Sequence, residues 1–203
     1  MKKNILIFIL SVLLFSSCEE TKQTSNDTNH LIAVIPNIEV LKDSIQLNGN
    51  EGNWYYKNEL FNGYSVRYYP NSTLQQKVGF LNGKKVGVAK IWHPNGVLKV
   101  QSHYNKNTLV GLYQSWWDNG NLASKSFYKN GKIDGVSKEW YPNGVLSKSR
   151  NLSEGQEVGM QQAWLKNGTL YVNYEAKNGR IFGMRRANSC YKLENEVVIS
   201  SKN

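Results

Sequence analysis

The chain contains few of the residues that usually bind metals or form cross-links. Among its 203 residues are only two cysteines, Cys18 and Cys190, and three histidines, His30, His93 and His103. No set of Cys, His and carboxylate residues has the spacing of a metal site. We therefore expect no metal and no cofactor.

The sequence also lacks the patterns that accompany covalent catalysis or phosphate binding. Serine and aspartate residues are scattered, without the combination of a nucleophile, a base and an orienting group. The glycines occupy turn positions and do not form a phosphate-binding loop. We expect that the protein is not an enzyme. A redox or enzymatic role for the thiol of Cys190 stays open as an alternative.

Long hydrophobic runs are absent except near the N-terminus. Two lysines precede an apolar run over residues 5–15, which is shorter than the roughly 20 residues that span a bilayer and is typical of a secretory signal. Ser16-Ser17-Cys18 follows and resembles the end of a bacterial lipoprotein signal. This resemblance implies a signal peptide over residues 1–17 and lipidation of Cys18. An ordinary signal peptide cut near Ser17 is the alternative.

Residues 19–30 contain no apolar side chain larger than the threonine methyl. Residues 18–30 are therefore predicted to be the lipidated cysteine and a flexible tether. Glu19-Glu20 resembles the acidic tags of surface-exposed lipoproteins. We expect an exported protein, anchored by its lipid in the cell envelope, at the outer membrane of a Gram-negative bacterium. The formal net charge of +10 would permit nucleic-acid binding, but this location argues against it.

What the chain does contain is a repeat of 24 residues. A glycine begins each unit, at positions 63, 87, 111, 135, 159 and 183. We count this glycine as position zero of its unit. Position five then carries Trp92, Trp116, Trp140 and Trp164, position nine carries Gly96, Gly120, Gly144 and Gly168, and position eleven carries Leu98, Leu122, Leu146 and Leu170.

Within each unit the apolar residues alternate, which is typical of β-strands. Pro-Asn-Gly at 94–96 and 142–144 predicts a three-residue hairpin turn with a left-handed glycine, and a two-residue Asn-Gly turn is the alternative. Ser72 replaces this glycine in the first unit, which predicts a strained or different turn there. Pairs such as Asn130-Gly131 predict a second turn. The predicted fold is all-β: an elongated, open-ended antiparallel meander of hairpins in a single sheet.

The apolar positions one, five, eleven and seventeen are all odd, so we expect them on one face of the sheet. The tryptophans of position five should stack in a row beside the leucines of position eleven and form the main stabilising element. We expect N-terminal strands and a degenerate leading half-repeat over residues 31–62, five repeats over 63–182, and a C-terminal cap and tail over 183–203.

The pattern Gly-x4-Trp-Tyr-Pro-Asn-Gly-x-Leu-x5-Tyr-x-Asn-Gly resembles the MORN-repeat variant of bacterial proteins, including those grouped as YwqK-family antitoxins. The resemblance covers roughly residues 52–186. It implies a MORN-type scaffold that binds and does not catalyse. With the N-terminal signal, it indicates a lipid-anchored interaction protein that binds a protein partner or a membrane surface. The alternative is an antitoxin or immunity protein that neutralises a toxin by direct binding.

Aromatic residues also occur among basic ones on the face expected to be mixed. Position six carries Tyr69, His93, Trp117 and Tyr141, and Lys90 and Lys138 are among the basic residues near them. Such a row would suit an acidic partner, a lipid headgroup or a carbohydrate. The alternative is that the lysines only keep an extended sheet soluble.

Overall fold

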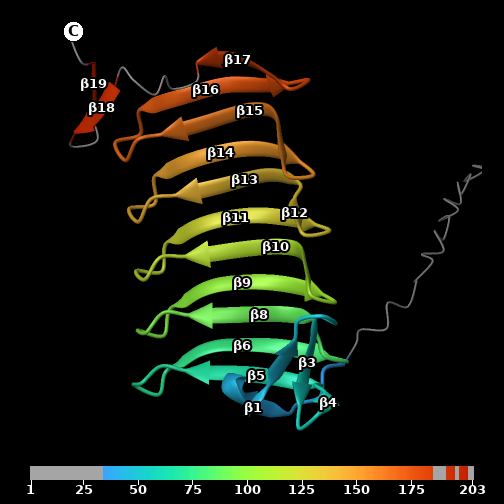
Figure 1. Ribbon diagram of the computed structural model, residues 1–203. Coiled ribbons are helices and arrows are strands. Elements are labelled where there is room, and N and C mark those ends of the chain that lie inside the picture. Colours follow the sequence, from blue (N-terminus) through green and yellow to red (C-terminus); the bar gives the residue numbers. More distant parts are fainter. Residues whose placement is uncertain (1–33, 185–190, 195–196, 201–203) are drawn as a thin grey trace, which may run out of the picture. The chain divides into compact units, whose positions relative to one another are not determined.

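The structure is a computed structural model that describes residues 34–184, 191–194 and 197–200 (Figure 1). The chain divides into two units, residues 1–32 and 33–203, and all described residues belong to the second unit. The predicted signal, lipidation site and tether lie outside the described residues, and so does Cys190. The described part of the chain includes no helix with the length and apolar character needed to cross a bilayer.

The repeats and one strand that precedes them form one 14-stranded sheet, in which neighbouring repeat strands run antiparallel (Figure 1). Along the sheet follow β5 (Gly63–Tyr68), β6 (Leu74–Leu81), β8 (Gly87–Trp92), β9 (Leu98–Asn105), β10 (Thr108–Trp116), β11 (Leu122–Lys129), β13 (Gly135–Trp140), β14 (Leu146–Ser153), β15 (Gln156–Trp164), β16 (Leu170–Lys177) and β17 (Arg180–Met184). The short strands β7 (Lys84–Lys85) and β12 (Lys132–Ile133) pair with β6 and β11. The predicted all-β meander of hairpins is confirmed.

The segment before the repeats forms elements of its own. β1 (Glu39–Leu41) covers the first edge of the repeat sheet by pairing in parallel with β5. After the 3-10 turn η1 (Lys42–Ser44), β2 (Gln46–Asn48), β3 (Asn53–Tyr56) and β4 (Glu59–Leu60) form a separate three-stranded sheet. The residues predicted to be a degenerate half-repeat include β3 and β4, and Phe61 O accepts the N–H of Gly83 over 3.0 Å, as Leu109 O accepts that of Gly131 in the repeats. Further along the chain, β18 (Tyr191–Glu194) pairs with β19 (Val197–Ser200).

The turn within each hairpin has the same geometry in all five units. In the second unit, His93 N–H donates to Val97 O over 2.8 Å and Gly96 N–H donates to His93 O over 2.9 Å. Gly96 has a φ of +85°, so the three-residue turn is confirmed. Ser72 closes the same turn with a φ of +65°, which strains a residue that carries a Cβ.

The second turn of each unit has positive φ at both of its residues, for example 51° at Asn130 and 80° at Gly131. This is a type I′ turn, whose twist matches that of the flanking strands. This Asn130-Gly131 turn also bonds to the strand that follows the turn before it, since Gly131 N–H donates to Leu109 O of β10 over 2.9 Å. Both ends of each hairpin are therefore fixed by local turn chemistry.

The two faces of the sheet differ from the predicted ones. Directly opposite residues share a face, and the pairs Gly135↔Leu152 and Val136↔Asn151 join position zero to seventeen and position one to sixteen. Positions one and seventeen therefore lie on opposite faces. The cause is a bulge beside the turn, where one extra residue reverses the alternation between Glu139 and Trp140.

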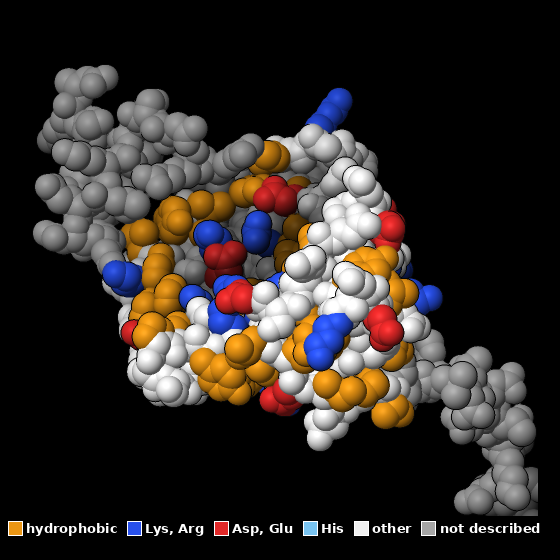
Figure 2. All heavy atoms as spheres, turned by 60° about the horizontal axis from the view of Figure 1, so that its bottom comes forward, with side chains coloured by type: hydrophobic (Ala, Val, Ile, Leu, Met, Phe, Trp, Pro, Cys, Tyr) orange, Lys and Arg blue, Asp and Glu red, His pale blue; other side chains and the backbone are white. Residues whose placement is uncertain are grey.

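We name the face with positions two, four, thirteen, fifteen and seventeen the inner face, and the face with positions one, three, fourteen and sixteen the outer face. Viewed from the β5 end, the molecule shows a hollow in which Lys, Arg, Asp and Glu side chains gather (Figure 2). Small buried residues such as Ser102, Ser126 and Ser137 belong to the inner face.

The core lies where the three-stranded sheet packs on the inner face of the first two units. Phe80 is fully buried and clusters with Val78, Ala89, Ile45 and Phe61. The ring of Phe80 lies 5.5 Å from that of Phe61, centroid to centroid. The main stabilising contacts therefore join the repeats to the segment that precedes them.

The tryptophans of position five do not form the predicted stack. They are half-buried beside the leucines, as in the direct pair Trp140↔Leu146. None of the ring pairs within the described residues joins two of these tryptophans. The reason is geometric: equivalent positions are two strands, or about 10 Å, apart, and stacked rings need about 4.5–7 Å.

Candidate functional site

The side chains of the predicted binding row bond to the main chain of the following repeat. The bonds run from Tyr69 Oη to Trp92 O (2.8 Å), from Trp117 Nε1 to Trp140 O (3.0 Å) and from Tyr141 Oη to Trp164 O (2.9 Å), and His93 Nε2 lies 2.9 Å from Trp116 O. These contacts link successive hairpins. The hydrogen bonds use the polar edges of the rings. Binding of a ligand by this aromatic row stays a prediction.

A second series of contacts runs along the turns and uses the asparagine of position eight. Asn95 Oδ1 accepts the N–H of Val97 over 3.1 Å within its own turn, and Asn95 Nδ2 donates to Asp118 O of the next repeat over 2.8 Å. One side chain thus shapes a turn and joins it to its neighbour. The asparagines of the first four units have this double role, and Asn167 of the fifth unit has the bond within its turn.

The structure does not bring Lys90 and Lys138 to the aromatic row. Both stand at position three on the outer face, whereas Trp117 and Tyr141 line a groove on the inner side together with Glu139. The predicted site therefore separates into two surfaces.

The first surface is a groove on the inner side of repeats three to five, beyond the three-stranded sheet. It has a volume of 710 Å³. Its lining includes the aromatic residues Trp117, Tyr141 and Tyr171 and the hydroxyls of Ser115 and Ser124. The two hydroxyls are hydrogen-bonded to each other at 2.6 Å. We refer to this surface as the groove.

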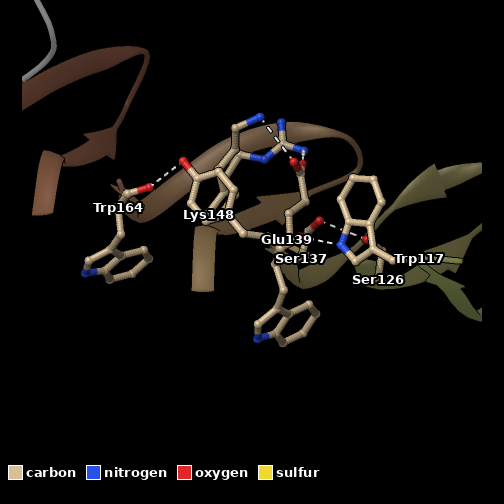
Figure 3. Close-up of polar contacts among 9 residues, drawn as sticks. Trp117, Ser126, Ser137, Glu139, Lys148 and Trp164 are labelled. Carbon is tan, nitrogen blue, oxygen red and sulfur yellow. Dashed lines mark hydrogen bonds and ion pairs between the residues drawn. The ribbon is translucent and has the colours of Figure 1, made fainter. Parts of the chain in front are cut away.

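Charged groups meet beside the groove at Glu139. Its two carboxylate oxygens accept Lys148 Nζ at 3.1 Å and Arg150 at 3.2 Å (Figure 3). Figure 3 also shows the ring of Trp117 on the side of Glu139 and Lys148, and the indole of Trp164 pointing the other way. Arg150 Nε is buried and has no partner among the described residues. The arrangement offers donors, acceptors and aromatic surface to a polar ligand.

The second surface is a row of lysines on the outer face. Cross-strand pairing places Lys77 opposite Lys90, Lys90 opposite Gln101, Gln114 opposite Lys125, and Lys125 opposite Lys138. Lys77 has an ion pair with Glu39. Lys90, Lys125 and Lys138 have no ion pair within the described part of the chain. We refer to these three residues as the lysine row.

Apolar side chains flank the lysine row. Phe127 and Val136 are about half exposed, at 52% and 51%, and with Leu112, Lys125 and Lys138 they line a shallow depression of 370 Å³. Like charges directly opposite each other destabilise a sheet. A face that combines such pairs with exposed apolar residues is therefore better suited to a partner than to water.

Sequence reasoning named Lys90, Lys125 and Lys138 among the basic residues of the mixed face but missed Glu139 and the groove. The lysine row has a readable signal, because its members stand at positions three and fourteen, which lie opposite each other within a hairpin and again between neighbouring hairpins. The groove has no such signal. It depends on the curvature of the sheet and on where the three-stranded sheet ends.

Within the described residues, no group of three or more His, Cys, Asp or Glu side chains is arranged to hold a metal ion. Comparison with known proteins gave no match to a curated protein. The MORN repeat variant matches residues 85–106, 109–130 and 133–151. These three segments coincide with consecutive hairpin units of the sheet, so this part of the chain is similar to MORN-type repeats.

Proposed function

We propose that the protein is a non-catalytic, lipid-anchored interaction protein of the cell envelope, which binds an acidic protein partner through its outer face. The observation that carries the proposal is the lysine row. The pair Lys125 and Lys138 places two cations directly opposite each other on adjacent strands, with no ion pair among the described residues. Carboxylates of a partner would relieve this repulsion.

The apolar residues beside the lysines support a protein as the partner. Phe127, Val136 and Leu112 offer a small hydrophobic centre, and the lysines offer a charged border. Protein interfaces commonly combine an apolar centre with a polar rim. Lipidation of Cys18 would keep this surface at the membrane, where several acyl chains suffice without a further membrane contact.

The test is a crosslinking capture from native envelopes with the full chain, followed by reconstitution of the captured protein with the purified chain. The variant is Lys125→Gln with Lys138→Gln. The matched control is Lys99→Gln with Lys106→Gln, which removes the same charge from exposed lysines outside the row. We expect one acidic protein in stoichiometric amount, lost with the first variant and kept with the control.

The outcomes separate the alternatives. Equal loss with both variants would mean that net charge alone decides binding, and would overturn the proposal. Binding to vesicles of anionic lipid, lost with the lysine-row variant and without any protein partner, would favour the membrane surface instead. A captured protein whose toxic activity is blocked in the complex would identify the chain as an immunity protein.

A further inference from the structure

The groove contains aromatic rings that are already held in place. The hydrogen bonds of Trp117 Nε1 to Trp140 O and of Tyr141 Oη to Trp164 O fix both rings through their edges. Trp117 nevertheless remains 38% exposed. A ring fixed at its edge loses little freedom when a ligand lies on its surface, so these side chains are preorganised platforms.

The spacing of the platforms follows from the repeat. Trp117 and Tyr141 occupy the same position in consecutive units, so they are about 10 Å apart, or two strand spacings. Tyr171 adds a third aromatic side chain from the next unit. Tyr171 stands at position twelve, so Trp117 and Tyr141 alone set the interval, and a ligand that lies on both must extend over about 10 Å. Two sugar rings of a linear β-linked glycan have about this extent.

The polar groups of the groove suit hydroxyl groups. The carboxylate of Glu139 accepts hydrogen bonds, Lys148 Nζ donates them, and the hydroxyls of Ser115 and Ser124 do both. Sugars have C–H faces that pack on aromatic rings and hydroxyls that need both donors and acceptors. A pocket with apolar walls and a few placed polar groups is the usual form of a small-ligand site.

A peptide fits this site less well. Peptides bound as added strands use the free main-chain groups of a sheet edge. The groove lies on a face, where the strands on either side are already paired, as β11 is with β13 and β13 with β14. We infer that the groove of repeats three to five binds a linear β-linked oligosaccharide. This site is separate from the lysine row, on the other face.

The experiment is isothermal titration calorimetry of the full chain with cellohexaose and chitohexaose, and with the α-linked maltohexaose as a control for linkage. Trp117→Ala removes the most exposed platform, and Tyr171→Ser removes a ring of the groove without removing a hydrogen bond between repeats. Trp117→Phe keeps an aromatic ring in case Trp117→Ala does not fold. Circular dichroism checks the fold of each variant.

We expect one of the β-linked hexasaccharides to bind, maltohexaose to bind at least tenfold more weakly, and Trp117→Ala and Tyr171→Ser each to lose at least tenfold in affinity. The Lys125→Gln, Lys138→Gln variant should bind the sugar normally, which separates this site from the protein-binding face. Absence of binding by both β-linked sugars at millimolar concentration would overturn the inference. Binding that survives both Tyr171→Ser and Trp117→Ala unchanged would overturn it as well, and if Trp117→Ala does not fold, unchanged binding by Tyr171→Ser alone would do so.

Discussion

The inner face of the sheet is mainly apolar in the first two units and carries an ion pair in the fourth, although the same repeat builds both regions. In the first two units it presents Val78, Phe80 and Ala89 to the three-stranded sheet. In the fourth unit the equivalent region presents Glu139 and Arg150 as an ion pair. The composition of the face thus follows what covers it, while turns and strand pairing stay constant. The repeat specifies the scaffold, and the positions between its fixed residues are free to specialise.

The largest expected effect comes from truncating the covered end. Phe80→Ala should lower the free energy of unfolding by about 3–5 kcal/mol, because it empties the centre of the aromatic cluster with Phe61 and Trp54. Phe127→Ala is the matched control, since Phe127 is 52% exposed on the outer face of the same sheet. Urea titration of both variants measures the difference. Similar losses would mean that the covered end is not the core.

The fold was predictable from the sequence because its signals are local. The residue types at Pro94-Asn95-Gly96 and at Asn130-Gly131 determine the geometry of the two turns. The period of 24 residues indicates that consecutive hairpins pair in one sheet. Odd or even position in the unit does not predict which face of the sheet a side chain occupies. A single bulge at each hairpin turn reverses the alternation, so position seventeen lies with positions two and fifteen.

The sites were predictable only in part. Trp117 and Tyr141 were named as ligand contacts, but the sequence does not show that their polar edges bond to the next repeat. Glu139 and Lys148 lie opposite each other in one hairpin and form an ion pair. Predicting this pair requires the strand register, including the bulge. The contact between Phe61 and Phe80 joins a residue before the repeats to a residue within them, so the repeat pattern does not predict it.

The second prediction tests whether the hydrogen bonds between successive turns stabilise the sheet. Asn95→Ala loses a bond within its turn and a bond to Asp118 O, so it should cost about 2 kcal/mol at roughly 1 kcal/mol each. Asn167 has the bond within its turn, to Thr169 N–H, and no bond to a further repeat among the described residues. Asn167→Ala should therefore cost about half as much in a urea titration. Equal costs would show that the contacts between turns add no stability.

A third, smaller effect concerns the turn at the covered end. Ser72 has a φ of +65° where the other four units carry glycine, for example Gly120 at +86°. Ser72→Gly should stabilise the protein by about 0.5 kcal/mol, because the strain of a left-handed residue exceeds the entropy that glycine loses on folding. The reverse change, Gly120→Ser at the open end, should destabilise by a similar amount. Thermal unfolding of both variants would show opposite shifts, and shifts of one sign would contradict the shared geometry.

The smallest expected effect tests the part of the inner face beyond the three-stranded sheet, through Tyr113. Burial raises the pKa of Tyr113, with smaller contributions from the nearby Tyr128 and Tyr104. A raised pKa in the folded state means that the unfolded chain releases this proton first, at about pH 10. The contribution of Tyr113 to stability is therefore complete below about pH 10 and is lost as the pH rises through the higher folded pKa. Tyr113→Phe removes this titration, so the variant should lose less stability than the wild type between about pH 8 and pH 11 in urea titrations. An identical alkaline loss in both proteins would mean that water reaches Tyr113 freely, and that the inner face of the third repeat is more open than the structure shows.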